Sequence, residues 1–296
     1  SPASSSLADP PSGAPRPTLR GAYWHLRVMK PLAFIAGKLG LGPQRTLTER
    51  LKQDFPDRVF DPPTSEAGNA AVGVGASMAG MRPFVDLGTG SFSYLAWSQI
   101  TNEAAVAHYM SNGRLTAPVT FHMLHGVRGG GAPQHSQSPH AMLWNAPGLE
   151  IAAPSTAADV YGLIRTALAS PNPTVVVSHA KLLGIETEVP EQKSPIPFGR
   201  GDIKRSGSDV TVVATSLMVH YCLAAAEALA KEGIAVEVVD PRTLVPLDEK
   251  TILDSVARTG RLVVVDECPL RGGIASEIAA TVAERGFRHL KAPIVR

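Results

Sequence analysis

Short runs rich in β-branched residues alternate with longer helical stretches over the last third of the chain, and no other feature constrains the fold as strongly. The runs at 210–214, 234–239 and 262–265 are mostly apolar, as expected for strands that are buried on both faces. Strands separated by helices pair in parallel, because a crossover must return the chain to the same edge of the sheet. The helices are expected at 217–232 with Ser216 as a cap, from a cap at Asp248 through residue 257, and at 274–285.

The first half of the chain repeats this alternation. Strands are expected at 82–87, 119–122, 149–152 and 174–178. Helices are expected at 46–54, 66–80, 92–110 and 156–169. The whole pattern predicts an α/β protein with two doubly wound domains whose sheets are mainly parallel.

Two stretches without periodicity divide the chain. Residues 1–17 are rich in Ser, Pro and Ala, which predicts a disordered N-terminal arm. Residues 181–207 lose the strand and helix rhythm and contain three prolines, which predicts a linker. The expected domains are therefore 18–180 and 208–296.

The charge balance excludes several classes of partner. The 296 residues include 28 Lys and Arg against 26 Asp and Glu, a formal net charge of +2, whereas a nucleic-acid partner demands a concentrated basic surface. No apolar run reaches the roughly 18–20 residues that a bilayer crossing needs, so no membrane partner is expected. We expect a cytoplasmic protein, with an organellar matrix as the alternative. Cys222 and Cys268 are too few and too far apart for a disulfide framework or a metal knuckle, and are expected to be buried, inert thiols.

Two groups of glycines invite a nucleotide-binding interpretation. The spacing of Gly73, Gly75 and Gly80 is not that of a dinucleotide fingerprint, and the segment predicts a small-residue helix that packs closely against another helix. The stretch 126–131 lacks the Lys-Ser/Thr ending of a phosphate-binding P-loop, which favours a flexible loop near a site. No Gly-Asp-Gly…Asn arrangement is present to hold Mg²⁺ against a diphosphate, so we expect no metal ligands in this chain.

Histidines and one glutamate are the candidate functional side chains. His122 and His125 flank the end of a predicted strand, and His135 and His140 lie in the polar loop after the glycines. Their spacing is not that of a zinc site. Glu66 begins a predicted helix of small apolar residues, so it is either a first-turn carboxylate favoured by the helix dipole or a functional group.

Together these segments resemble a known family over residues 40–296. The stretches that carry the resemblance are 58–61 (RVFD), 65–68 (SEAG), 79–83 (AGMRP), 99–105 (QITNEAA), 109–113 (YMSNG), 134–139 (QHSQSP), 153–156 (APST), 239–244 (VDPRTL) and 272–273 (GG). The chain resembles the beta subunit of the thiamine-diphosphate-dependent first component of 2-oxoacid dehydrogenase complexes. This transketolase-like family includes the pyruvate, branched-chain and acetoin enzymes. The resemblance implies a pyrimidine-binding domain followed by a transketolase C-terminal-like domain.

The resemblance implies roles for three residues. Glu66 matches the glutamate that hydrogen-bonds the aminopyrimidine ring of the cofactor, and Phe92 matches the aromatic residue that stacks on that ring. His135 matches the histidine near the thiazolium, which assists proton transfer when the acyl group passes to a lipoyl arm. Catalysis is thus expected from Glu66 and His135, and cofactor binding from Glu66 and Phe92.

The resemblance also implies an assembly. The expected reaction is oxidative decarboxylation of a 2-oxoacid with thiamine diphosphate and acyl transfer to a lipoyl-bearing acyltransferase. The cofactor would lie between this chain and an alpha subunit that holds Mg²⁺, in an α₂β₂ heterotetramer.

Several departures from the family pattern leave alternatives open. Gly37-Lys38-Leu39 stands where the family has an acidic pair, Ser98 replaces an aspartate, and His122 replaces a basic or aromatic residue. The sequence stops at Arg296, where relatives continue, so the second domain is expected to be truncated. One alternative is a non-catalytic structural or regulatory homologue. The other is half of a split transketolase-like enzyme.

Overall fold

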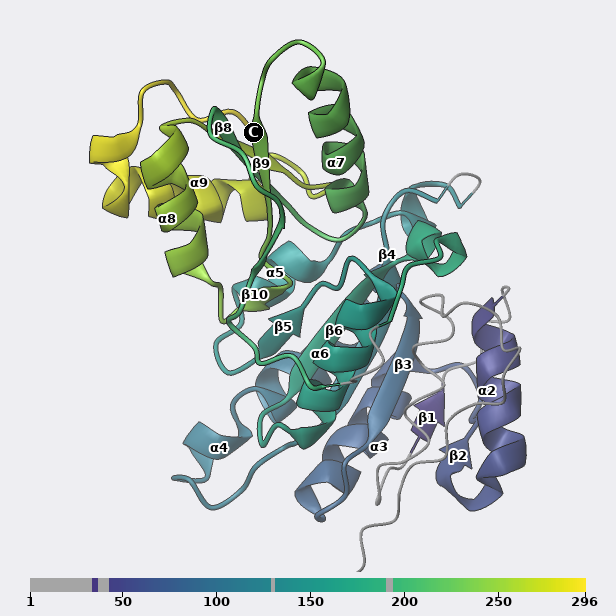
Figure 1. The fold of residues 1–296 in the computed structure, drawn as a ribbon. Helices are drawn as coiled ribbons and strands as arrows, with labels where there is room; N and C mark the ends of the chain where they lie inside the picture. The colour runs from purple at the N-terminus through teal and green to yellow at the C-terminus, as the bar shows by residue number, and fades with distance from the viewer. Residues whose placement is uncertain (1–33, 37–42, 129–130, 190–193) are drawn as a thin grey trace, which may run out of the picture.

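The computed structural model of the chain describes residues 34–36, 43–128, 131–189 and 194–296. The predicted disordered arm and the departure at residues 37–39 lie outside these residues. Two sheets with helices on both faces form two layered bodies, one above the other in the view of Figure 1. This confirms the predicted α/β class with mainly parallel sheets.

The larger sheet, within the described residues, has seven strands in the order β10-β5-β6-β4-β3-β1-β2. All its pairs are parallel except the pair of β10 with β5. The strands are β1 (Phe34–Ala36), β2 (Val59–Phe60), β3 (Phe84–Thr89), β4 (Thr120–His125), β5 (Glu150–Ala152), β6 (Thr174–His179) and β10 (Thr243–Val245).

Both faces of the larger sheet are buried. In β3, Val85 and Leu87 pack in one apolar cluster together with side chains of α3 (Glu66–Met78), whereas Phe84 packs in the other with side chains of α6 (Ala157–Ala169). Successive side chains of a strand point to opposite faces, so the continuous apolar runs in the sequence follow from burial on both sides.

The smaller sheet has four described strands in the order β11-β8-β9-β7. The strands are β7 (Asp202–Arg205), β8 (Val210–Ala214), β9 (Val236–Asp240) and β11 (Leu262–Val265). Only β7 is antiparallel to its neighbour. Its helices are α7 (Leu217–Ala230), α8 (Glu249–Thr259) and α9 (Ile274–Arg285). Figure 1 shows α7 on the side of this sheet opposite to α8 and α9, the doubly wound arrangement that the alternation predicts.

Most predicted helix ends agree with the structure. Asp248 caps α8 by accepting a hydrogen bond from the Thr251 N–H at 3.0 Å, and α8 ends at Thr259, followed by Gly260 with a φ of +74°. Ser65 caps α3 by accepting from the Gly68 N–H at 3.2 Å.

Among the described helices, none has the length and the hydropathy needed to cross a membrane.

The predicted helix 92–110 is wrong in its continuity. The segment forms a 3-10 helix η3 (Gly90–Ala96), a π-helical turn η4 (Gln99–Ala104) and a short helix α4 (Ala107–Met110). The Ser93 hydroxyl donates to the Gly90 carbonyl at 2.6 Å, and such side-chain bonds to the local backbone compete with α-helical hydrogen bonds.

Four described strands were not predicted from the sequence, and they are β1, β2, β7 and β10. β7 lies in the segment that was interpreted as a linker, and it joins the second sheet as an edge strand with a polar sequence. β10 lies in the part assigned to the second domain, yet it pairs with β5 at the edge of the first sheet. Edge strands carry weak periodicity, because only one of their sides must be paired and buried. The domain boundaries themselves stay a prediction.

The close packing expected at Gly73 is present, but α3 packs there against the strand β3 and not against another helix as predicted. A Cβ on Gly73 would lie 2.4 Å from Cγ2 of Val85, so α3 approaches β3 more closely than a larger residue allows. A Cβ on Gly75 would meet no atom within 4 Å, because this residue faces outward.

Candidate active site

Glu66 lies at the first position of α3, where the chain leaves the Ser65 cap. Its side chain is buried, with 9% of the residue exposed. Among the described residues, none forms a hydrogen bond or an ion pair with the Glu66 carboxylate. A buried carboxylate normally needs such a partner, so this group is available to a donor from outside the described chain.

Phe92 and His135 meet in space although 43 positions separate them in the sequence. Phe92 lies on η3, and His135 ends the short 3-10 helix η5 (Pro133–His135). Their ring centroids are 5.3 Å apart at an interplanar angle of 71°, an edge-to-face contact. Both side chains are partly exposed, so a ligand can reach them.

The three predicted site residues come from elements that are packed together. α3, which begins with Glu66, packs against η3, which carries Phe92. The Ser91 hydroxyl donates to the Gln134 carbonyl and so ties η3 to the loop that carries His135. The structure thus brings Phe92 and His135 into contact and places the helix of Glu66 beside them.

A second polar cluster lies at the ends of the central strands. His125 ends β4 and His179 ends β6, and the two residues are partners in the register of the sheet. The ring of His125 makes edge-to-face contacts with His179 at 5.0 Å and with His140 at 4.8 Å. Burial lowers the pKa of His125 well below its usual value, and the neighbouring charges of His140 and His179 lower it further. His125 is therefore neutral at physiological pH.

Residues of the second domain complete this cluster. Glu267 Oε2 lies 2.5 Å from His179 Nε2, and Asp266 Oδ2 lies 3.6 Å from His140 Nε2. Gly126 passes beside the first pair with φ +89°, and a Cβ there would lie 2.0 Å from His179 Nε2. Only glycine fits this position, both for its backbone conformation and for space.

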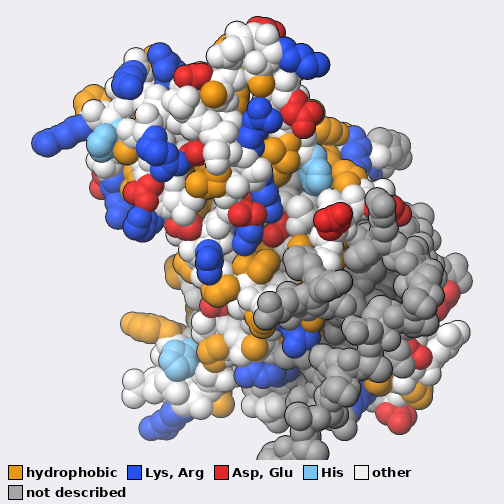
Figure 2. All heavy atoms as spheres, viewed as in Figure 1, with side chains coloured by type: hydrophobic (Ala, Val, Ile, Leu, Met, Phe, Trp, Pro, Cys, Tyr) orange, Lys and Arg blue, Asp and Glu red, His pale blue; other side chains and the backbone are white. Residues whose placement is uncertain are grey.

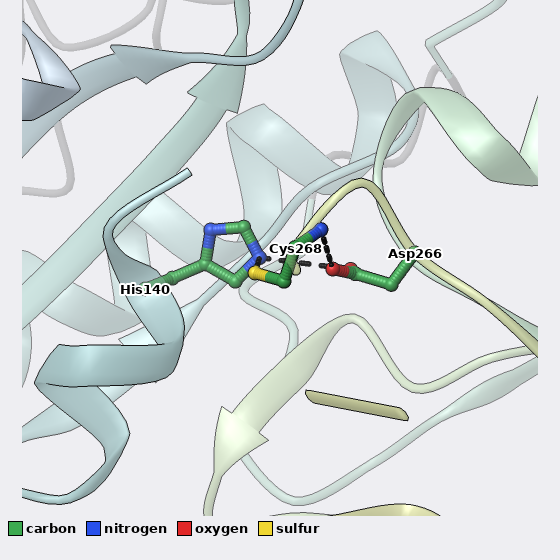
Figure 3. Close-up of side chains that lie close together, drawn as sticks. All are labelled: His140, Asp266 and Cys268. Atoms are coloured by element: carbon green, nitrogen blue, oxygen red, sulfur yellow. Dashed lines mark hydrogen bonds and ion pairs between the residues drawn. The ribbon is translucent and has the colours of Figure 1, made fainter. Parts of the chain in front are cut away.

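His140, Asp266 and Cys268 point toward one another in Figure 3. His140 begins α5 (His140–Trp144), and the other two residues follow β11. Their donor atoms lie within 4.8 Å of one another, close enough for all three to reach one metal ion. In the structure the Asp266 carboxylate accepts hydrogen bonds from the Thr215 hydroxyl and the Cys268 N–H, so the arrangement is a hydrogen-bonded network.

Two expectations for this region need correction. Cys222 is buried as expected, but Cys268 is only partly buried, and its sulfur lies 3.1 Å from His140 Nε2. Ser216 precedes α7 but forms no side-chain cap; its hydroxyl lies 3.4 Å from His125 Nε2 and 3.3 Å from the Pro154 carbonyl. Both side chains contact residues of the first domain. A local sequence pattern cannot predict such contacts, because the partners are distant in the sequence.

This cluster cannot be recognised from residue spacing, because its members are distant in the chain. A spacing motif detects side chains that lie on one segment, whereas this cluster forms where two strand ends, one helix start and one loop converge. One signal was present in the sequence: Asp266 and Glu267 directly follow a predicted parallel strand, and functional side chains gather at the carboxyl ends of such strands.

Two family models match the chain. The model described as "Transketolase, pyrimidine binding domain" matches residues 35–185, and "Transketolase, C-terminal domain" matches residues 199–296. The first match alone covers more than half of the chain. The chain belongs to the transketolase-like family.

Beta subunits of acetoin and pyruvate dehydrogenases are similar to this chain over most of its length, so the chain belongs to the beta-subunit branch of the family. The acetoin:2,6-dichlorophenolindophenol oxidoreductase subunit beta of Cupriavidus necator is 44% identical over 248 residues, which are 84% of this chain and 73% of that protein. The pyruvate dehydrogenase E1 component subunit beta of Rickettsia felis is 39% identical over 282 residues, covering 94% of this chain and 86% of the relative. The mitochondrial subunit beta-1 of the same component in Arabidopsis thaliana is 42% identical over 255 residues, covering 84% and 70%.

A solved structure shares the fold of this family member. It is described as "Split gene transketolase, inactive beta4 tetramer", and it superposes with a TM-score of 0.75 at 26% identity. The match covers 94% of this chain and 86% of that chain. The fold of this chain, over both domains, is therefore that of the transketolase-like structure.

Proposed function

We propose that this chain is the beta subunit of a thiamine-diphosphate-dependent 2-oxoacid dehydrogenase, active when it assembles with an alpha subunit. The observation that carries the proposal is the buried Glu66 carboxylate, which no described residue of the chain hydrogen-bonds. Named relatives that are beta subunits of pyruvate and acetoin enzymes support the reaction class.

The residues of the site fit the cofactor. Glu66 offers an acceptor for a proton shared with a ring nitrogen, and Phe92 offers a partly exposed aromatic face for stacking on a pyrimidine. Bound thiamine diphosphate would supply the electron sink for loss of carbon dioxide from the 2-oxoacid. The sequence has no motif for Mg²⁺ and the diphosphate, so these ligands are assigned to the alpha subunit.

His135 is assigned to proton transfer. Its edge contact with Phe92 fixes the plane of the imidazole, and its partial exposure leaves the ring accessible to an incoming group. A histidine in this position can give and take a proton as the acyl group passes to a lipoyl arm. The acyltransferase that carries the lipoyl group is part of the proposal.

Exposed apolar side chains support a protein partner. They are Val72 on α3, Leu95 on η3, and Tyr109 and Met110 on α4, all more than 60% exposed. α3 packs against η3 and η4, and α4 packs against η4. In Figure 2 apolar side chains project over the region of α4. Exposed apolar side chains are typical of interaction sites, and we assign these to contacts in an α₂β₂ assembly.

A test combines the purified chain with its alpha subunit, Mg²⁺ and thiamine diphosphate. Reduction of 2,6-dichlorophenolindophenol should depend on a 2-oxoacid, and pyruvate, branched-chain 2-oxoacids and acetoin are compared as donors. Absence of dye reduction with every 2-oxoacid would contradict the proposal, and reduction with acetoin alone would assign the chain to an acetoin enzyme instead. The cytoplasmic location stays a prediction that this assay does not address.

The solved relative named as a split transketolase favours a second candidate function. Half of a split transketolase-like enzyme would use the same cofactor on a ketose phosphate donor. Adding a ketose phosphate and an aldose phosphate acceptor to the same mixture separates the two activities.

Calorimetric titration of the assembled pair with thiamine diphosphate identifies the third alternative, a non-catalytic homologue, because that protein would show no binding heat.

A further inference from the structure

The loop that carries His135 is held from the side of the first domain. The Ser91 hydroxyl donates to the Gln134 carbonyl. Pro139 closes the other end of the loop, and its ring would lie 2.9 Å from a Cβ on Gly90, so the backbone of η3 and the loop are in close contact. These contacts fix the two ends of the segment but not its middle.

The second domain reaches the same loop from the opposite side. The Cys268 sulfur lies 3.5 Å from the Ser138 carbonyl, in the geometry of an S–H donor to that oxygen. The Ser138 hydroxyl also lies 3.1 Å from His125 Nδ1, and the other nitrogen of that ring faces the Ser216 hydroxyl. Ser138 is therefore contacted by His125 of the first domain and by Cys268 of the second.

Asp266 fixes the position of Cys268. Its Oδ1 accepts the Cys268 N–H at 2.6 Å, and its Oδ2 accepts the Thr215 hydroxyl. Burial alone would raise the pKa of Asp266, but the hydrogen bond and charge of His140, with the donors of Thr215 and Cys268, hold that pKa below its usual range. The carboxylate stays ionised and keeps all its donors.

The protonation of the Cys268 thiol decides whether the sulfur can donate a hydrogen bond. Burial raises the pKa of Cys268, and the negative charge of Asp266 raises it further, so the sulfur keeps its proton. The sulfur lies 3.5 Å from the Ser138 carbonyl oxygen and 3.1 Å from His140 Nε2, so the protonated thiol can donate to that carbonyl while it packs against the His140 ring. The stick view in Figure 3 shows the sulfur between the His140 ring and the Asp266 loop.

We propose that Cys268 and Asp266 are positioning residues, which hold Ser138 from the second domain and so set where His135 stands in the active site. This inference rests on the proposed function for its catalytic consequence, but not for the anchoring itself. Neither residue touches the reacting atoms. The second domain thereby contributes to the geometry of a site whose proposed catalytic side chains all lie in the first.

The anchoring is tested on the full chain alone by hydrogen–deuterium exchange. In Cys268→Ala, amides of residues 131–138 other than Pro133 should exchange about two- to threefold faster, because a thiol is a weak hydrogen-bond donor. Cys268→Ser, whose hydroxyl can still donate to the carbonyl, should restore slow exchange. Cys222→Ala is the matched control, because this other cysteine is buried on α7 away from the loop and should leave these amides unchanged.

The catalytic consequence is tested on the chain assembled with its alpha subunit. Cys268→Ala should lower kcat for acyl transfer about tenfold with little change in KM, because a displaced His135 affects the proton transfer and not the binding of the 2-oxoacid. The serine variant should recover most of the rate. In a His135→Asn background, the alanine substitution should cost nothing further, since both changes act through one group.

The outcomes separate this inference from the proposed function. Unchanged exchange in Cys268→Ala would overturn the anchoring whatever the activity. Faster exchange with an unchanged kcat, or equal losses in the presence and absence of His135, would overturn the positioning role. An assembled wild-type protein that shows no donor-dependent activity would contradict the proposed function, and the exchange results would still decide the anchoring.

Discussion

The Ser155 hydroxyl lies between two buried carboxylates, 2.6 Å from Asp240 Oδ2 and 3.0 Å from Asp159 Oδ2. Ser155 precedes α6 of the first domain, whereas Asp240 ends β9 of the second. One hydroxyl proton cannot satisfy two carboxylates, so a further proton on Asp240 would complete the bonding. Burial raises the pKa of Asp240 to about 6, and the charge of Asp159 adds to this.

The first prediction is a pH-dependent stability that comes from Asp240. Between its ordinary pKa of 3.8 and its folded pKa of about 6, this carboxyl is protonated in the fold and ionised in the unfolded chain. The folded state then binds more protons, so the contribution of Asp240 to the free energy of unfolding falls as pH rises through this window, by up to about 3 kcal/mol. Urea unfolding at pH 4.5 and 6.5 measures it.

An amide can reproduce the protonated form of this group. Asp240→Asn should remove the dependence in this window and be at least as stable as the wild type at pH 7, because the amide can donate to Ser155 and still accept from the Arg242 N–H. Asp254→Asn, a change at a largely exposed carboxylate, is the control and should leave the slope unchanged. An unaltered slope in Asp240→Asn would contradict the assignment.

The second prediction concerns Lys204, which neutralises the same cluster. Its Nζ lies 2.9 Å from Asp202, 3.2 Å from Asp159 and 3.6 Å from Asp240, and the side chain is only 13% exposed. Burial would lower the pKa of Lys204, but the carboxylates raise it above its usual value, so the ammonium stays charged. Lys204→Met should cost about 3–5 kcal/mol, because the buried Asp240 loses its described cation and Asp159 keeps only Arg242 of its two.

The matched control for Lys204→Met is Lys250→Met on α8. Lys250 is 84% exposed and forms a surface ion pair with Asp254 one turn away, so its loss should change the stability far less than the loss of Lys204. Chemical denaturation of the two variants at pH 7 and the same ionic strength gives the comparison. Equal losses in both variants would show that the interdomain cluster contributes no more than a surface pair.

The third prediction compares two glycines on α3. Gly73→Ala should destabilise the protein by about 1–3 kcal/mol, because the new methyl group meets the stiff side chain of Val85 at 2.4 Å. Gly75→Ala has open space around it and should stabilise the helix by about 0.5–1 kcal/mol. Thermal unfolding of the two variants should therefore shift in opposite directions, and shifts of the same sign would contradict the packing.

The fourth prediction concerns Glu66. Glu66→Gln should lower the donor-dependent activity of the assembled enzyme at least about 100-fold, because an amide cannot share a proton as a carboxylate does. The fold should be unaffected, since no described residue bonds this side chain. Circular dichroism and thermal unfolding check the fold, and Glu103→Gln, at an exposed position on η4, is the control for activity. Full activity in Glu66→Gln would refute its assigned role.

Local patterns predicted the elements that have strong local causes. The strand β8 and the cap at Asp248 agree with the structure, because continuous apolar runs and cap side chains act within a few residues. The segment 92–110 failed because its apolar periodicity fits a helix, whereas its hydroxyl groups bond their own backbone. β7 and β10 were missed because their partners lie elsewhere in the chain.

The candidate site divides in the same way. The resemblance of whole motifs predicts Glu66, Phe92 and His135 as site residues, and the structure places Phe92 against His135. The network behind them was not found. Cys268 was interpreted as an inert thiol, since its contacts with His140 and Ser138 span more than a hundred residues of sequence.

The sequence by itself determined the two α/β domains, their mainly parallel sheets and the segments that carry the proposed site, because periodicity, caps and motifs act over short distances. Only the tertiary structure decided which strand ends meet and which domain supports the His135 loop. It also decided that Ser155, Asp159, Asp240 and Lys204 share one buried cluster between the domains. The physical reason is that desolvation and pairing of polar groups depend on neighbours from distant segments, and these are fixed only when the sheets pack together.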